Sequence, residues 1–286
     1  MYDLGDVTVV PLVENPRLLI EPEEFFPRLA GDRSGWCFAE PWYDTGADRL
    51  VYAIRAFLVR APDRTVLVDA CVGDAKPRRR PEFDDQHTGW LDAAGSIGLD
   101  PDDVTDVVLT HLHVDHVGWA TRRAGPAWEP VFARARHHVT AREYDYWTGP
   151  AGAAAMHRTG DYLADSVHPL RERGLLRLTA PNAAIGNRIR LVPAFGHTPG
   201  NVCVHVTGSE SDLWLLGDAL HHPLQLLRPD WSTRYCVDPA AAARTRRALL
   251  DRLAATAAPM LPAHFAYPRP GRVTRAGTGY TFEPET

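Results

Sequence analysis

The sequence predicts an α+β protein with layers of sheet and helix. Along its 286 residues, β-rich and helical stretches follow one another in the order β, α, β, α, which suits a layered fold of two similar halves, about 1–125 and 126–286. We expect one domain over 1–286, because the chain can bury a large core and shows no short-period repeat or low-complexity segment. Its 45% hydrophobic content is ordinary for a globular protein.

Apolar and β-branched runs predict the strands of the first half. These strands lie at 7–13, 53–59, 65–69 and 104–109. A helix is predicted over 88–98, where apolar residues recur at helical spacing, and it leads directly into the strand at 104–109.

The second half begins with short strands and helices and then returns to β-structure. Strands are predicted at 131–133, 137–140, 188–193, 201–206 and 212–216, and helices at 141–147, 152–176 and 238–255. Asp238 is a suitable N-cap for the last helix, since proline follows it at the first helical position.

The segment 110–118 reads Thr-His-Leu-His-Val-Asp-His-Val-Gly and follows a buried strand. Imidazole and carboxylate together suit Zn²⁺, Mn²⁺ or Fe²⁺, so the segment predicts a metal site. In an extended chain His111 and His113 project the same way, whereas Asp115 and His116 need a turn to converge. One metal could bind the first pair and a second metal the other pair. Gly118 would permit a tight turn after them.

Three further residues are candidate ligands because each stands in a turn or at the end of a strand. His197 lies in a turn fixed by Gly196, Pro199 and Gly200. Asp218 and His264 each end an apolar run.

Taken together, these motifs resemble the metallo-β-lactamase superfamily, in which HxHxDH is followed by His, Asp and His in this order. The resemblance covers nearly the whole chain. It implies a four-layer αββα sandwich of two mixed β-sheets with helices on the outer faces and a metal site in a cleft at one edge. It also implies that one metal is held by His111, His113 and His197, that the other is held by Asp115, His116 and His264, and that Asp218 bridges both.

This resemblance implies two divalent cations, with Zn²⁺ expected first and Mn²⁺ or Fe²⁺ as alternatives. A hydroxide bridging them would attack a small-molecule ester, lactone or thioester, while one metal polarises the substrate oxygen. Asp115 or Asp218 would shuttle the proton to the leaving group.

Within the superfamily the chain is most similar to the lactonase and organophosphate-hydrolase-like branch, through segment 217–225 and through His264 with Phe265. Lactonases of this branch carry a tyrosine three residues after the bridging aspartate, where this chain has His221. Either His221 donates to the substrate oxygen in its place, or it packs beside Pro223. Many members also have a histidine at the position of Asn201.

Aromatic residues are unusually dense in segment 21–43. The segment is either a lid or substrate wall, or a loop whose aromatic side chains are buried. Trp119 and Trp147 are likewise either walls of the substrate pocket or core residues.

Two other activities of the same fold remain open. A binuclear site can polarise a carbonyl for elimination or isomerisation, as in a non-hydrolytic tailoring enzyme of small-molecule biosynthesis. A mono-iron oxygenase would use the same ligands incompletely.

Charge and composition argue against a nucleic-acid partner. The net charge is −5, and the one compact basic run, 76–80, is expected to be a solvated loop. Lys76 in this run is the only lysine, so Schiff-base chemistry has no suitable nucleophile. A small-molecule substrate is therefore the expected partner, and a homodimer is one assembly that the sequence leaves open.

Four scattered cysteines form no CxxC pair, which indicates a reduced cytosolic protein with buried thiols. The acidic N-terminal residues do not resemble a secretion signal, and no apolar run is long enough for a transmembrane helix. We therefore expect a cytoplasmic location and no association with membranes.

Overall fold

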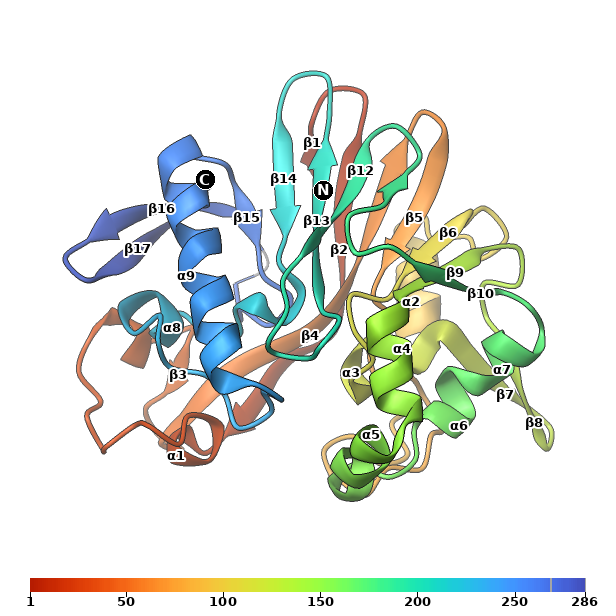
Figure 1. Ribbon diagram of the computed structural model, residues 1–286, viewed down its shortest axis with the longest axis horizontal. Coiled ribbons are helices and arrows are strands. Elements are labelled where there is room, and N and C mark those ends of the chain that lie inside the picture. Colours follow the sequence, from red (N-terminus) through yellow and green to blue (C-terminus); the bar gives the residue numbers. More distant parts are fainter. Residues whose placement is uncertain (268, 286) are drawn as a thin grey trace.

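The central strands carry apolar side chains on both faces, which places them between two layers of core. In β4 (Arg49–Ala61), Phe57 and Val59 face the second sheet, whereas Leu58 between them faces the opposite layer. This computed structural model describes residues 1–267 and 269–285. It shows two β-sheets packed together with helices outside them (Figure 1). The expected sandwich of two mixed sheets is confirmed.

The first sheet contains the N-terminal strands and two that follow the ligand motif. Its order is β1 (Tyr2–Asp3), β2 (Thr8–Ile20), β4, β5 (Arg64–Val68), β6 (Asp106–Val108), β9 (Arg136–Thr140) and β10 (Leu176–Thr179), with β3 (Tyr43–Asp44) paired to β4. From β5 to β10 the neighbouring strands are parallel, while the others are antiparallel.

The second sheet is built entirely from the last part of the chain. Its order is β11 (Ala184–Ile185), β12 (Ile189–Pro193), β13 (Val202–Thr207), β14 (Asp212–Leu215), β15 (Met260–Leu261), β16 (Gly271–Ala276) and β17 (Gly279–Pro284). Only β14 and β15 are parallel neighbours within it. The chain therefore changes sheet between Thr179 and Ala184, rather than near residue 125, where we expect the halves to meet.

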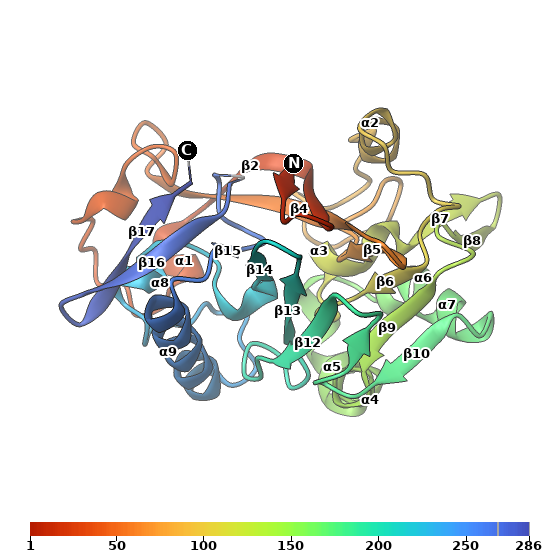
Figure 2. The same ribbon diagram turned by 90° about the horizontal axis from the view of Figure 1, so that it is seen from above.

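Helices complete the outer layers. α9 (Pro239–Thr256) covers the second sheet, with Leu250 and Leu253 in the core between them. On the other side of the molecule lie α4 (Ala141–Thr148), α5 (Pro150–Ala155), α6 (Leu163–Ser166) and α7 (His168–Glu172) (Figures 1 and 2). The remaining helices are α1 (Pro22–Phe25), α2 (Trp90–Ser96), α3 (Val114–Val117) and α8 (Leu224–Leu227). Among the described residues, no helix is both long and apolar enough to cross a membrane.

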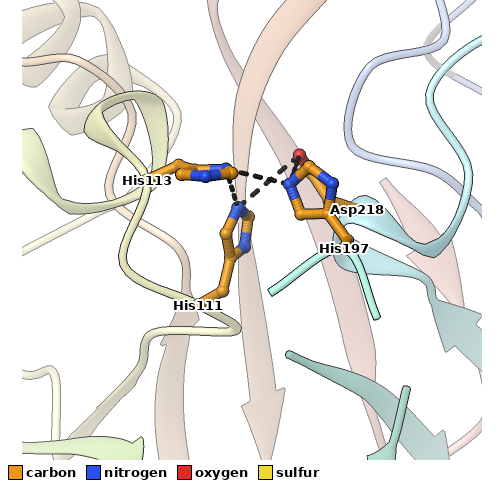
Figure 3. A group of neighbouring side chains, drawn as sticks. All are labelled: His111, His113, His197 and Asp218. Atoms are coloured by element: carbon orange, nitrogen blue, oxygen red, sulfur yellow. Dashed lines mark hydrogen bonds and ion pairs between the residues drawn. The ribbon is translucent and has the colours of Figure 1, made fainter. Parts of the chain in front are cut away.

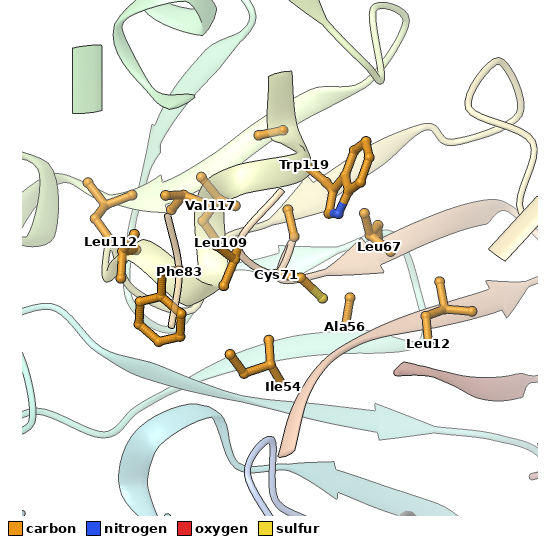
Figure 4. Packing of buried hydrophobic residues seen from close by; sticks show 14 of the residues in the cluster. Leu12, Ile54, Ala56, Leu67, Cys71, Phe83, Leu109, Leu112, Val117 and Trp119 are labelled. Atoms are coloured by element: carbon orange, nitrogen blue, oxygen red, sulfur yellow. The ribbon is translucent and has the colours of Figure 1, made fainter. Parts of the chain in front are cut away.

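The ligand motif is anchored in the core by its own apolar residues. Leu109, Leu112 and Val117 pack in one buried cluster with side chains of β4 and β5 (Figure 4). These apolar residues are interspersed with the polar residues of the motif. Their burial therefore fixes the backbone, and with it the direction in which the side chains of the histidines and Asp115 point.

Two predicted elements are wrong. Residues 131–133 form bends and a turn rather than a strand, because the preceding residues already pair as the hairpin β7 (Thr121–Ala124) and β8 (Ala127–Pro130). The predicted helix over 152–176 is divided into α5, a 3₁₀ turn, α6 and α7. Gly160, whose φ is 89°, interrupts it.

The basic run 76–80 is not the solvated loop that the sequence predicts. Lys76 is fully buried, and its Nζ lies 2.8 Å from Oγ1 of Thr121 and 3.1 Å from Oδ1 of Asp165. Arg78 is buried as well and binds both oxygens of Asp165, at 2.5 and 2.9 Å. Asp165, which lies 89 residues after Lys76 in the sequence, therefore compensates for the burial of both positive charges.

Replacing Lys76 by methionine should lower the free energy of unfolding by about 2–4 kcal/mol, because buried Asp165 loses one of its two cations and Thr121 loses a partner. Urea unfolding measures the difference. Arg79→Met is the matched control, since the side chain of Arg79 is exposed and donates to the backbone carbonyl of His157. Equal stability of Lys76→Met and the parent protein would contradict this account.

Candidate metal centre

The ligand motif runs from a strand end into a short helix. His111 and His113 follow β6, and Asp115 and His116 lie on α3, which supplies the turn that they need to converge. Gly118, by contrast, has an ordinary helical φ of −61°. A Cβ on Gly118 would lie 1.7 Å from the carbonyl oxygen of Val72, so glycine is required here for close packing and not for a special turn.

The second sheet supplies the other three candidate ligands. His197 lies in the turn between β12 and β13, Asp218 lies in a 3₁₀ turn after β14, and His264 follows β15. Gly217, with φ of 48°, provides the left-handed conformation that turns the chain at the end of β14. Because β14 and β15 are parallel neighbours, Asp218 and His264 emerge at the same edge.

Four side chains form the first group, which Figure 3 shows. Nδ1 of His113 lies 3.0 Å from Nε2 of His111 and 2.8 Å from Nε2 of His197. Oδ2 of Asp218 lies 3.1 Å from Nε2 of His197. The potential ligand atoms of the group all lie within 4.8 Å of one another.

The second group consists of Asp115, His116 and His264. Nε2 of His116 lies 3.2 Å from Nε2 of His264 and 3.9 Å from Oδ2 of Asp115. The other oxygen of Asp218, Oδ1, lies 3.2 Å from His116 and 2.9 Å from His264. Asp218 therefore presents one oxygen to each group, and all seven predicted ligands meet in one place.

The nitrogens that point away from the centre have partners of their own. His111 Nδ1 lies 3.1 Å from Oγ1 of Thr110, and His264 Nδ1 lies 2.8 Å from the carbonyl oxygen of Ala53. His197 Nδ1 lies 3.5 Å from Sγ of Cys236. These contacts fix the ring orientations so that Nε2 of each of the three histidines faces the centre.

Two buried carboxylates that the sequence analysis missed hold the ligand loops. Asp69, just after β5, accepts from the backbone N–H of Thr110 at 2.8 Å and lies 2.8 Å from Nδ1 of His116. Its position at the end of an apolar strand is the same signal that indicated Asp218. Glu143 on α4 accepts from the backbone N–H groups of Leu112 and Gly200, at 3.0 and 2.8 Å, and so joins the motif to the loop of His197.

Two opposing effects act on the pKa of Glu143. Burial raises the pKa of Glu143, while hydrogen bonds from Leu112, Thr198, Gly200 and Trp147 oppose the shift.

The centre opens into a cleft of about 680 Å³. Trp147 and Phe25 line it, so one predicted tryptophan and one aromatic residue of segment 21–43 form part of its walls. Trp119 does not: it stacks on Trp90 in the core, with ring centroids 5.6 Å apart. Most other aromatic residues of segment 21–43 are also buried in the core, as Phe26 and Phe38 are.

His221 lies inside the centre. Its Nε2 is 3.1 Å from Oδ2 of Asp218, and neither ring nitrogen makes a hydrogen bond among the described residues. Burial lowers the pKa of His221 to about 4 although Asp218 opposes the shift, so the ring is neutral and has one N–H to donate. His222 is different, because Trp42 and Leu224 engage both of its nitrogens.

Solved structures with the same fold cover the whole chain. The dizinc quorum-quenching lactonase AidC, in complex with a product, aligns with a TM-score of 0.82 and 22% identity over 100% of this chain and 96% of its own. The hydrolase AbOPH of the beta-lactamase superfamily aligns with a TM-score of 0.83 and 23% identity over the same shares. A probable metal-dependent hydrolase from Staphylococcus aureus aligns with a TM-score of 0.77 and 16% identity over 99% of both chains.

Sequence comparison adds a relative and a family model. N-acyl homoserine lactonase AiiB of Agrobacterium fabrum is 33% identical over 95 residues, which are 28% of this chain and 34% of that protein. The match therefore spans about a third of the relative's length. The family model described as "Metallo-beta-lactamase superfamily" matches residues 50–264, which contain all seven candidate ligands. The chain belongs to the metallo-β-lactamase superfamily.

Proposed function

We propose that this protein binds two divalent cations and hydrolyses a small-molecule ester, lactone or thioester. The observation that carries the proposal is the convergence of two ligand groups, joined by Asp218, at the floor of a cleft of about 680 Å³. A dizinc lactonase and hydrolases share the fold.

The residues fit such cations. Imidazole nitrogens of His111, His113 and His197 face one another at 2.8–3.0 Å, and those of His116 and His264 at 3.2 Å. Where the outward nitrogen carries the proton, the inward nitrogen offers a lone pair, and facing lone pairs repel unless a cation lies between them. Oδ1 of Asp218 is buried and accepts no hydrogen bond from the described residues.

His111, His113, His197 and Asp218 would hold one ion, and Asp115, His116, His264 and Asp218 the other. Imidazole and carboxylate ligands suit Zn²⁺ best, with Mn²⁺ or Fe²⁺ as alternatives. Bound ions lower the pKa of water and polarise a carbonyl oxygen, which is the chemistry that hydrolysis needs.

The protein's own groups complete the site. His221 donates its N–H to the carbonyl oxygen of the substrate, because it is the one imidazole of the centre that remains outside both ligand groups. Asp115 is the more exposed of the two acids, and it takes up the proton that moves to the leaving group. Phe25 and Trp147 line the cleft and exclude water from the acyl part of the substrate.

The direct test is metal content per chain together with a hydrolysis panel of aryl esters, lactones, thioesters and a phosphotriester. About two metals with ester or lactone turnover would support the proposal. Oxygen-labelled water separates it from a tailoring enzyme, because only hydrolysis incorporates the label into the product. A single iron with oxygen consumption would instead indicate a mono-iron oxygenase.

Asp218→Ala should remove at least one of the two ions and nearly all turnover, because this carboxylate faces both ligand groups. Elemental analysis of the purified variant gives the ion content. An unchanged ion content with retained turnover would refute the bridging role.

Asp69→Asn should weaken metal binding by about 10- to 100-fold, because the amide no longer anchors Nδ1 of His116 as an anion does. A competition titration with a chelating dye measures the affinity. Asp212→Asn is the matched control: Asp212 also binds a histidine, His205, at 2.7 Å, but outside the centre. Equal losses in both variants would exclude a specific role for Asp69.

His221→Ala should lower kcat on the order of 100-fold while the metal content stays unchanged, since a donor to the developing negative charge is lost. His221→Gln, which keeps an N–H donor, should retain part of the rate. Steady-state kinetics with elemental analysis checks both variants, and an unchanged kcat in the alanine variant would assign His221 to packing.

A further inference from the structure

Arg80 lies in the cleft, although the sequence assigns it to a solvated run. It lines the same cavity as the candidate ligands, whereas its neighbour Arg79 points to solvent and binds the carbonyl oxygen of His157. A half-buried guanidinium loses part of its hydration, and this loss must be compensated by interactions within the protein or with a ligand.

The guanidinium of Arg80 is held in a fixed position. Nε and Nη2 bind Oε1 of Glu82, the former at 2.7 Å. The planar group stacks over Phe83 at 4.8 Å from the ring centroid and over Tyr235 at 5.2 Å. Glu82 accepts from Nε and Nη2, and Tyr235 also shares a hydrogen bond with the guanidinium, whose five N–H groups still leave donors for a ligand. Such a preorganised group binds an anion with little loss of side-chain entropy.

Two tyrosines line the cleft together with Arg80, and we call this part of the cleft, formed by Arg80, Tyr52 and Tyr235, the Arg80 corner. Tyr52 and Tyr235 line the cavity, and Phe25 contacts both, with ring centroids 5.8 and 5.9 Å away. The Tyr52 hydroxyl makes no hydrogen bond to the described residues, although its side chain is almost fully buried. Because Tyr52 lines the cavity, its hydroxyl can donate to a ligand there.

The corner adjoins the metal centre. Phe25 also contacts His221, with ring centroids 5.9 Å apart, and Tyr52 contacts His264 at 6.0 Å. Tyr52 therefore touches the candidate ligand His264 directly, while Tyr235 and Phe25 lie in a chain of ring contacts from Arg80 to His221. Arg80 and the ligand groups line one cavity, so a substrate with two polar ends could contact both.

The cleft outside the ligand groups is positively charged. Arg80, Arg158 and Arg234 line it, and the only acid of the lining apart from Asp115 and Asp218 is Glu24, among the described residues. Glu24 binds Arg234 and Glu82 binds Arg80, which leaves Arg158 at the mouth without an ion pair within the described part of the chain. This excess favours an anionic ligand.

We propose that Arg80, with the hydroxyls of Tyr52 and Tyr235, binds a carboxylate of the substrate, so that the preferred substrate is the ester, lactone or thioester of an acid carrying a second, free carboxylate. The proposal rests on the proposed hydrolase function. A carboxylate is planar and matches the guanidinium edge, and the phenols can donate to its oxygens.

The test compares two matched substrates of the metal-loaded protein. One is the para-nitrophenyl monoester of glutarate, which has a free carboxylate, and the other is the same ester with that carboxylate methylated. The parent protein should show a kcat/KM at least about tenfold higher for the anionic ester, as expected of a charge-assisted hydrogen bond.

Arg80→Gln should abolish this preference by lowering kcat/KM for the anionic ester about tenfold or more while changing that for the methylated ester little. Arg80→Lys should keep part of the preference through its charge. Arg79→Gln, the matched control outside the cleft, should behave as the parent protein. No preference in the parent protein, or an equal loss for both esters in Arg80→Gln, would overturn the proposal.

A binding measurement separates this proposal from the hydrolase proposal. Phenoxypentanoate carries the carboxylate but no bond to hydrolyse, and phenoxypentanol is its neutral analogue. Calorimetric titration should show binding of the acid that Arg80→Gln weakens and Arg79→Gln does not. If both esters are inert, the full hydrolysis panel decides the hydrolase proposal and this titration decides the carboxylate site: acid binding that depends on Arg80 sustains the site, and binding that is absent or independent of Arg80 refutes it.

Discussion

The centre depends on buried carboxylates that collect N–H donors from loops far apart in the sequence. Asp69 fixes the start of the motif and the ring of His116. Glu143 joins Leu112 to Gly200, which lies 57 residues after Glu143 in the sequence. Each interaction exchanges hydration for hydrogen bonds in a medium of low polarity, where an unpaired acid would be strongly unfavourable. The histidines can therefore face one another only while these acids hold the backbone beneath them.

The charged groups differ between the floor of the cleft, around Asp218, and the region around Arg80. Five imidazoles lie within 3.6 Å of buried Asp218, and no arginine or lysine of the described residues forms an ion pair with it. Such a centre would suit small cations. Farther from the floor the cleft changes character, because Arg80 and two phenols form one corner and Phe25 and Trp147 form apolar walls. A ligand with one polar end at the floor and one anionic end at Arg80 matches both regions.

The sequence predicts this site better than it predicts the elements around it. His111, His113, Asp115 and His116 are concentrated in one motif, so local spacing is enough to mark them as candidate ligands, and the structure brings them together. Three strands of the second sheet, β12, β13 and β14, were also predictable from their apolar runs, whereas β11, β16 and β17 were not predicted as strands. The burial of Lys76 was not predictable, because it depends on an ion pair with Asp165. Asp165 lies on α6, within a segment for which the sequence predicts one continuous helix. Asp69 and Glu143 were not predicted, because each is an isolated acid in the sequence. Their role depends on backbone N–H groups of other loops that only the fold brings to them.

The placement of the ligands on both sheets has a mechanical consequence. The described contacts join His113 to His197, 84 residues apart, and His116 to His264, 148 residues apart. An ion at each group would act as a cross-link that closes a long loop, and the chain entropy that such a link removes from the unfolded state grows with loop length. All four cysteines are free, so no disulfide restrains the sandwich. Its two sheets would be held together at the open edge by the same ions that serve the reaction.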